Sequence, residues 1–290
     1  MKLKLFHRNL CYMVALRLAY STCPNDTFIF GAIAQKLIST EPFDLNIHLA
    51  DIQQLNMLAR KGEVDICKVS FLTYFLLREK YELLPVGSAI GRGCGPLLIA
   101  RPGINENTDL RSMRIGIPGW DTTAHFLLHY FNPNIPSENK KVLLFHQIIP
   151  ALLNNEIDVG VIIHESRFIY QRWGLKLLID LGEYWEKSTQ ALIPLGAIII
   201  RKVLTPSIKE HFVYLLKQSI EYAFANPASL MPYIHSLAQE LEEEVIKAHI
   251  KLYVNEYTRD LGTEGNASIE HFFEVANQLN WDFIARAFID

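Results

Sequence analysis

The sequence predicts an α/β protein built from two similar lobes that face each other across a cleft. Candidate strands alternate with candidate helices from the start of the chain, a pattern typical of mostly parallel sheets covered on both faces. An apolar helical stretch, a breaker and an acidic strand occur in this order twice, once before Ser70 and once before His164. Glycines concentrate between residues 87 and 102, as expected for a connection between lobes.

The first α/β series is predicted over residues 14–69. Hydrophobic periodicity predicts strands over residues 14–19, 45–50 and 64–69, and helices over residues 27–37 and 52–60. Asp51, with Gln54 three residues later, is a candidate capping box for the second helix, and Gly62 is its predicted C-terminal stop. Asn25 or Asp26 is the candidate N-cap of the first helix.

A second α/β series follows the glycine-rich segment. The glycine-rich segment ends in an apolar strand predicted over residues 97–100. In the second series, strands are predicted over residues 113–117, 142–145 and 159–163, and helices over residues 122–131 and 147–153. An apolar strand over residues 195–200 returns the chain to the first lobe, and residues 207–290 are predicted to be almost wholly helical. We therefore expect a discontinuous first lobe (13–101 and 196–290), an inserted second lobe (102–195) and an N-terminal extension (1–12).

The duplicated unit supports this division into lobes. Its acidic strand reads Glu63-Val64-Asp65-Ile66-Cys67 in the first copy and Glu156-Ile157-Asp158-Val159-Gly160 in the second. The separation from Asp65 to Asp158 is too long for a solenoid period and suits two facing lobes. Because one copy ends in Ser70 and the other in His164, both side chains are expected at the same cleft.

Composition limits the possible functions. With 290 residues, 50% of them hydrophobic and 20% charged, the chain is typical of a globular protein with a substantial core. The formal net charge is -3, and lysines and arginines are scattered along the chain. This distribution provides no basic surface for nucleic acid or an anionic membrane, so a small-molecule partner is expected.

The cysteines and the N-terminus indicate a cytoplasmic protein with reduced thiols. The four cysteines, Cys11, Cys23, Cys67 and Cys94, form no Cys-x-x-Cys pair, which argues against a disulfide framework and a zinc site. Residues 1–12 are basic, but Arg17 interrupts the apolar stretch after them, so no signal peptide is predicted and Met13 is a candidate start. No run approaches the roughly 18 apolar residues of a membrane span.

His164 is the first candidate for chemistry. It stands where an apolar strand ends, and ligands of open α/β sheets bind at that end of the strands. Histidine can act as a general base near neutral pH. A packed histidine at a strand end is the commoner case, but the duplicated unit favours a cleft-facing base.

Two loops between a strand and a helix occupy equivalent places in the two series. The loop over residues 21–27 offers Asp26 and the free N–H groups of a helix start, and the loop over residues 118–124 offers hydroxyls and amides that suit a substrate carboxylate. Ordinary helix caps would look the same in either loop.

Several other motifs do not support a function. The run Gly91-Arg92-Gly93-Cys94-Gly95 precedes a strand, so tight bends explain it better than a dinucleotide site does. His125 and His129 are four residues apart but have no evident third metal ligand, which favours a place on a helix surface. Ser70 and Ser166 lack a Gly-x-Ser-x-Gly elbow. The acidic run 240–244 is explained by a solvated helix face.

Five motifs in order resemble the 1,4-dihydroxy-6-naphthoate synthase family of the futalosine route to menaquinone. They are Ser21-Thr22-Cys23-Pro24-Asn25-Asp26-Thr27-Phe28-Ile29-Phe30, Gly91-Arg92-Gly93-Cys94-Gly95-Pro96-Leu97, Pro118-Gly119 with Thr122-Thr123-Ala124, Ile162-Ile163-His164-Glu165-Ser166-Arg167-Phe168, and Tyr253-Val254-Asn255. The resemblance extends from Leu16 to at least Gly265. Within the motifs, Cys94 and Asp121 depart from the residues expected of the family.

The resemblance implies a periplasmic-binding-protein-like (type II) fold with two mixed, mostly parallel sheets. It also implies a lyase that converts cyclic dehypoxanthine futalosine to 1,4-dihydroxy-6-naphthoate and releases dihydroxyacetone, with no cofactor and no metal. His164 would be the general base. Substrate contacts would come from Asp26, Asn56, Ser70, Thr123, the Ala124 amide and Tyr253.

Two alternatives remain from the sequence. A solute-binding protein for a small carboxylate would use the same fold with His164 as a ligand contact only, although the absence of a predicted signal peptide speaks against it. The related chorismate dehydratase of the same route is the second alternative, and the run from His164 to Arg167 favours the synthase.

Overall fold

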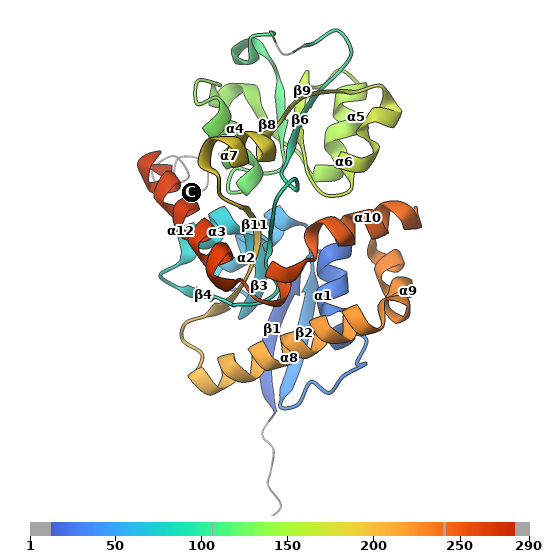
Figure 1. The fold of residues 1–290 in the computed structure, drawn as a ribbon, viewed down its shortest axis with the longest axis vertical. Coiled ribbons are helices and arrows are strands. Elements are labelled where there is room, and N and C mark those ends of the chain that lie inside the picture. Colours follow the sequence, from blue (N-terminus) through green and yellow to red (C-terminus); the bar gives the residue numbers. More distant parts are fainter. Residues whose placement is uncertain (1–12, 106, 240–241, 282–290) are drawn as a thin grey trace, which may run out of the picture.

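Two mixed β-sheets, each flanked by helices, form the framework of the chain (Figure 1). The computed structural model describes residues 13–105, 107–239 and 242–281. The predicted extension 1–12 lies outside these residues, and so do residues 240–241 of the acidic run. The predicted α/β class with two mixed sheets is confirmed.

The first sheet contains β1 (Val14–Tyr20), β2 (Phe43–Leu49), β3 (Ile66–Ser70), β4 (Tyr81–Leu83), β5 (Ala89–Gly91) and β11 (Ile193–Arg201). Its order is β2-β1-β3-β11-β4, with β5 also paired to β11. The strands β2 and β3 run parallel to β1, as the alternating pattern predicted. The returning strand β11 runs antiparallel to β3, β4 and β5.

The second sheet contains β6 (Leu97–Ala100), β7 (Ile115–Ile117), β8 (Lys140–Val142), β9 (Val159–Ile162) and β10 (Lys176–Asp180), in the order β10-β6-β9-β7-β8. The strand β7 is parallel to β8 and β9, whereas β6 is antiparallel to β9 and β10. Residues 97–100 were predicted for the first lobe, and this assignment is wrong because β6 forms its hydrogen bonds in the second sheet. The other lobe boundaries remain a prediction.

The helices are α1 (Pro24–Ala34), α2 (Ile52–Lys61), α3 (Phe71–Leu77), α4 (Thr123–Phe131), α5 (Ile148–Leu153), α6 (Ser166–Ile169), α7 (Leu181–Thr189), α8 (Pro206–Ala225), α9 (Pro227–Leu237), α10 (Glu243–Tyr253), α11 (Glu256–Arg259) and α12 (Gly262–Gln278), with short 3-10 turns at Leu110–Ser112, Ser137–Asn139, Phe145–Gln147 and Tyr170–Trp173. The mostly helical C-terminal part is confirmed for its described residues. α1 packs against α8, α9 and α10. Among the residues described, no helix is long and apolar enough to cross a membrane.

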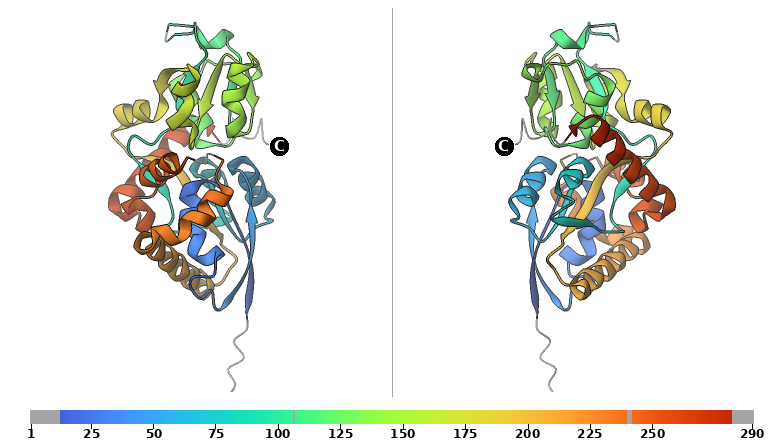
Figure 2. Two further views of the ribbon diagram at one scale, coloured as in Figure 1. Left: turned by 90° about the vertical axis from the view of Figure 1, so that its right-hand side faces the viewer. Right: turned by 90° about the vertical axis from the view of Figure 1, so that its left-hand side faces the viewer.

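The helix α12 lies alongside both lobes (Figure 2). Phe272 places its ring centroid 4.6 Å from that of Phe126 in α4, which packs in the second lobe. The neighbouring Phe273 lies 5.2 Å from Phe75 in α3 of the first lobe. One apolar cluster therefore crosses the lobe boundary, which limits how freely the two lobes can separate.

The duplicated unit is repeated down to its ion pairs. Asp65 accepts hydrogen bonds from the backbone N (2.9 Å) and Nε (3.0 Å) of Arg17. Asp158 accepts the same two bonds from Arg114, each at 3.0 Å. Each aspartate thus connects the residue just before β3 or β9 to the neighbouring parallel strand β1 or to the residue just before β7.

Three local predictions need correction. The first helix begins at Pro24, with Cys23 as its N-cap, because proline fixes φ for a first helical position; neither Asn25 nor Asp26 is the cap. The strand predicted over 142–145 is shifted, since Phe145 lies in a 3-10 turn. His125 is buried rather than on a helix surface, since its ring packs against Trp281.

Other local predictions are confirmed. Asp51 caps α2 by accepting hydrogen bonds from the N–H groups of Gln53 and Gln54, and Gly62 ends that helix in the left-handed region. Gly95 lies in the connection from β5 to β6, where it packs directly on the backbone of Gly182. A side chain at Gly95 would collide with that backbone, which explains part of the glycine density.

Candidate active site

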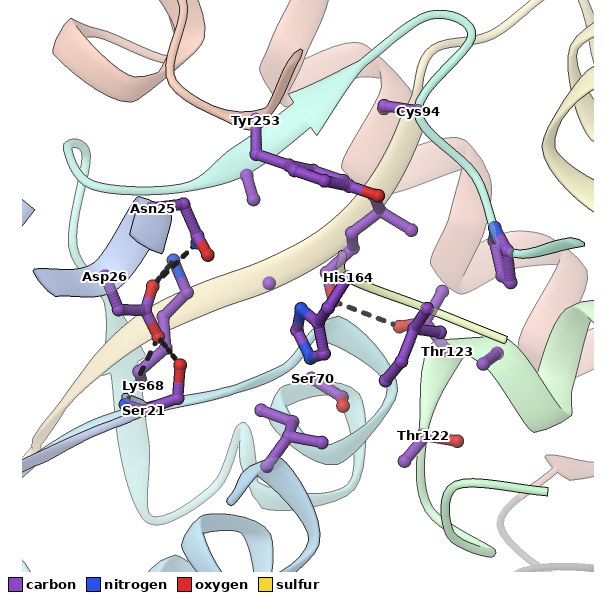
Figure 3. Close-up of a pocket in the computed structure, with 17 residues that line it drawn as sticks. Ser21, Asn25, Asp26, Lys68, Ser70, Cys94, Thr122, Thr123, His164 and Tyr253 are labelled. Atoms are coloured by element: carbon purple, nitrogen blue, oxygen red, sulfur yellow. Dashed lines mark hydrogen bonds and ion pairs between the residues drawn. The ribbon is translucent and has the colours of Figure 1, made fainter. Parts of the chain in front are cut away.

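A cavity of about 650 Å³, including its opening to solvent, lies where the two sheets present the ends of their strands. Both lobes line it, and Figure 3 shows the side chains that converge there. The lining residues are Ser21, Asn25, Asp26, Ile52, Lys68, Ser70, Ala89, Cys94, Pro96, Thr122, Thr123, Ala124, Ile163, His164, Leu195, Gly196 and Tyr253. This size suits a small organic molecule.

His164 reaches the middle of this cavity from the loop after β9 (Figure 3). Its backbone has φ of 56°, a left-handed conformation that is uncommon for a residue with a side chain and that recurs at functional sites. The ring lies between Phe145 and His249, with centroid separations of 4.9 and 6.0 Å. Two aromatic neighbours thus hold the imidazole in place.

The surroundings of His164 keep its imidazole neutral. Burial lowers the pKa of His164 to about 4, while the carboxylate of Asp26 raises it and the ammonium of Lys68 lowers it. At neutral pH a ring nitrogen therefore carries a free lone pair, which a general base requires.

Ser70 lies at the end of β3, in the first copy of the duplicated unit, and lines the cavity. Its N–H donates to Asn56 Oδ1 at 3.0 Å, and its hydroxyl lies 3.4 Å from Asn56 Nδ2. Asn56 is fully buried beside Ser70 and is absent from the cavity lining. Its predicted place in the pocket wall is therefore not supported, and its contacts position Ser70 instead.

The second-lobe loop presents the N-terminus of α4 to the cavity. Thr122 is the N-cap, accepting a hydrogen bond from the N–H of His125 at 3.2 Å. Thr123 and Ala124 follow at the first helical positions and line the cavity. Their N–H groups have no acceptor within the helix, so this end of α4 favours an anionic or carbonyl oxygen.

Asp26 stands at the centre of a buried polar network that also lines the cavity (Figure 3). It accepts hydrogen bonds from Ser21 Oγ at 2.7 Å and Asn25 Nδ2 at 2.8 Å. Lys68 Nζ lies 3.1 Å from Asp26 Oδ1 and donates to Gly87 O at 3.0 Å. An ammonium has three donors, so Lys68 keeps one for a ligand.

Sequence reasoning did not select Lys68. A lysine within an apolar strand is a weak signal, but this one follows the duplicated acidic strand directly, next to Ser70 in the pattern. Lys68 and its partner Asp26 are each only 3% exposed, and buried charges that are paired and line a cavity are frequent at functional sites.

A protein-family model described as menaquinone biosynthesis matches residues 16–278 of the chain. The chain belongs to this menaquinone biosynthesis family. Two curated relatives named 1,4-dihydroxy-6-naphtoate synthase are similar to it. The protein from Streptomyces coelicolor is 40% identical and covers 88% of this chain and 90% of its own, and the protein from Thermus thermophilus is 39% identical and covers 91% and 94%.

Solved structures agree with the fold of this family member. A protein of Archaeoglobus fulgidus superposes with a TM-score of 0.86 at 30% identity, covering 92% of this chain and 98% of its own. An alkanesulfonate-binding protein from Xanthomonas axonopodis has a TM-score of 0.69 at 13% identity, covering 95% and 94%. The second likeness concerns the fold alone, and it confirms the periplasmic-binding-protein-like architecture.

The two positions that depart from the family's expected residues both lie close to the site of this menaquinone biosynthesis protein. Cys94 lines the cavity. Asp121 is fully buried between the lobes, where Arg60 lies 3.2 Å from its Oδ2 and Thr73 donates to its backbone oxygen at 2.9 Å. Asp121 thus connects the second lobe to α2 and α3 of the first.

Tyr253 closes the cavity from the end of α10. Its ring centroid lies 4.6 Å from that of His249, the same ring that stacks on His164. Burial raises the pKa of the Tyr253 phenol above its ordinary value, so the hydroxyl keeps its proton. Six of the seven predicted site residues therefore line one cavity: Asp26, Ser70, Thr123, Ala124, His164 and Tyr253.

Proposed function

We propose that this chain is a carbon–carbon lyase that converts cyclic dehypoxanthine futalosine to 1,4-dihydroxy-6-naphthoate, with release of dihydroxyacetone. The observation that carries the proposal is the position of the His164 imidazole inside a cavity lined by polar groups of both lobes. The names of the two curated relatives supply the reaction class.

His164 would begin the reaction as the general base. Its free ring nitrogen takes a proton from the substrate to start the elimination that aromatises the second ring. The third N–H of Lys68 is placed to stabilise negative charge that develops on a substrate oxygen. Formation of an aromatic ring supplies the driving force, so a positioned base in an enclosed cavity is sufficient.

Substrate binding would divide between the lobes. The hydroxyl of Ser70 comes from the first lobe, and the hydroxyl of Thr123 and the Ala124 amide come from the second. Oxygen atoms of the substrate that contact both sides would hold the lobes closed and keep water from the reacting carbon. We expect the reaction to take place in the cytoplasm and to need no cofactor. We expect neither a nucleic acid nor a membrane as a partner.

A solute-binding role is the alternative from another class. The fold is shared with binding proteins, but their identity to this chain is far lower than that of the two synthases. In the cavity lining, Lys68 is the side chain whose positive charge could bind the carboxylate of a transported solute, and it already pairs with Asp26. The chorismate dehydratase alternative has no support among these relatives.

Incubation of the purified protein with cyclic dehypoxanthine futalosine tests the proposal. We expect dihydroxynaphthoate and dihydroxyacetone in equal amounts by liquid chromatography and mass spectrometry, also in the presence of a metal chelator. His164→Gln should bind the substrate in calorimetry but lose at least about a hundredfold in kcat. Absence of product from the wild-type protein, or near-normal turnover by His164→Gln, would refute the proposal.

A further inference from the structure

Four side chains that ligate metals well gather at His164, which lines the cavity. One candidate ligand atom each of Cys23, His164 and Glu165 lies within 4.8 Å of the other two. His249 joins them from α10, with its Nδ1 atom 3.9 Å from Glu165 Oε2. Three separate segments supply these groups: the N-cap of α1, the loop after β9, and α10.

The hydrogen bonds around His249 determine which nitrogen carries its proton. The Asn25 amide donates from Nδ2 to Asp26 at 2.8 Å, so its Oδ1 is the atom that faces His249 Nε2 at 3.0 Å. An amide oxygen only accepts, and Nε2 must therefore be the N–H donor. The Nδ1 atom of the neutral ring consequently carries a lone pair that can accept a hydrogen bond or bind a cation.

This lone pair is buried and unused. His249 is fully buried, and its Nδ1 has no hydrogen-bond partner in the described part of the chain. A buried acceptor without a donor is destabilising. Its nearest charged neighbour is the carboxylate of Glu165, which also accepts when it is ionised. Two facing acceptors leave a position that suits a cation.

We propose that Cys23, His164, Glu165 and His249 form a binding site for a divalent transition-metal ion of the zinc class. Thiolate, imidazole and carboxylate are the ligands that zinc takes, at about 2.0–2.3 Å in a tetrahedron. Such a tetrahedron needs ligand atoms about 3.5 Å apart. Side-chain rotation would have to draw the candidate atoms of Cys23, His164 and Glu165 closer by at most about 1.3 Å.

Binding would have two chemical consequences. The S–H bond of Cys23 breaks as the sulfur–metal bond forms, and the proton leaves to solvent, which favours binding at higher pH. A ring nitrogen of His164 becomes a ligand and can no longer accept a proton from the substrate. The metal would therefore inhibit the enzyme; this second consequence rests on the proposed function, whereas binding does not.

Cobalt absorption spectroscopy tests the site without turnover. We expect metal-free protein carrying Cys11→Ser, which removes a thiol outside the described residues, to bind one Co²⁺ with a thiolate charge-transfer band that Zn²⁺ abolishes. Cys23→Ser should lose that band, and His249→Gln should bind at least about tenfold more weakly. The control Cys67→Ser, another buried thiol, should keep the full spectrum.

The outcomes separate the site from the proposed reaction. A charge-transfer band that survives Cys23→Ser, or Co²⁺ affinity unchanged by both Cys23→Ser and His249→Gln, would overturn the site. If the site stands, Zn²⁺ should inhibit turnover of the wild-type protein at least about tenfold more strongly than that of His249→Gln. Equal inhibition of the two proteins by Zn²⁺ would overturn the inhibitory role. If the wild-type protein showed no turnover, the proposed function would fail, but the cobalt spectrum would still test the metal site.

Discussion

Replacing Lys68 with methionine removes one charge of a buried ion pair and keeps most of the side-chain length. The pair Lys68 Nζ to Asp26 Oδ1 spans 3.1 Å, and both side chains are almost fully buried. At an effective dielectric constant of about 20, Coulomb attraction at this distance is about 5 kcal/mol. Removing one partner of a buried pair costs about 3–5 kcal/mol, because the other charge stays buried.

The remaining contacts of Asp26 reduce this cost. Its carboxylate keeps hydrogen bonds from Asn25 and Ser21, so we expect Lys68→Met to lower the free energy of unfolding by about 3 kcal/mol. Asp26→Asn in the same chain removes the isolated charge. The double variant should then recover stability, with a coupling energy of about 2 kcal/mol between the two positions.

Urea unfolding of the wild type, the two single variants and the double variant measures this coupling. Lys209→Met is the matched control, because Lys209 pairs with the half-exposed Glu82 and should cost at most about 1 kcal/mol. Turnover of the double variant should stay low although stability returns, since the N–H of Lys68 is missing. A coupling energy below about 0.5 kcal/mol would refute the argument.

The other predictions concern single positions. Gly95→Ala should lower the free energy of unfolding by about 3 kcal/mol, because the new Cβ would lie 2.3 Å from the Cα of Gly182. Gly265→Ala is the control: its nearest neighbour is 3.5 Å away, so it should change the free energy of unfolding by less than about 1 kcal/mol. Urea unfolding measures both. Burial, reinforced by the charge of Lys140, lowers the pKa of His125 to about 3. The unfolded chain therefore binds the extra proton below pH 6.5, and stability should fall as the pH drops from 6.5 toward 3, by up to about 1.4 kcal/mol per pH unit. A His125→Gln variant with the same slope as the wild type would contradict this cause. Thr123→Val should raise KM about fivefold, since one hydrogen bond contributes about 1 kcal/mol, and leave kcat nearly unchanged; an unaltered KM would remove Thr123 from the binding groups.

Local sequence signals were sufficient where one element determines its own limits. The strand over residues 97–100 and the end of α2 at Gly62 were predicted where they occur, because apolar β-propensity and a left-handed glycine act within a few residues. The helix Phe71–Leu77 was missed, since an almost wholly apolar run has no amphipathic period. The strand Lys176–Asp180 was also missed; it lies at a sheet edge, where half-exposed residues alternate weakly.

The same distinction applies to the candidate site. Loops and residues that follow strands in the two series predicted part of the cavity lining, because the ends of parallel strands meet at one edge. Asn56 came from the resemblance alone, and its contacts to Ser70 depend on packing between α2 and β3 that no local pattern encodes. Cys94 was set aside as a bend, although the crossover places it in the cavity wall.

By itself, the sequence determined the α/β class, the duplicated unit and the placing of Ser70 and His164 at equivalent strand ends, since these follow from periodicity and short-range backbone preferences. Only the tertiary structure decided that Lys68 pairs with Asp26 and that His249 stacks on His164. The contact from Asn25 to His249 joins residues 224 positions apart, through the packing of α10 against α1. Burial, proton positions and ligand-sized spacings arise from such packing, because no local preference encodes the distance between segments so far apart in the chain.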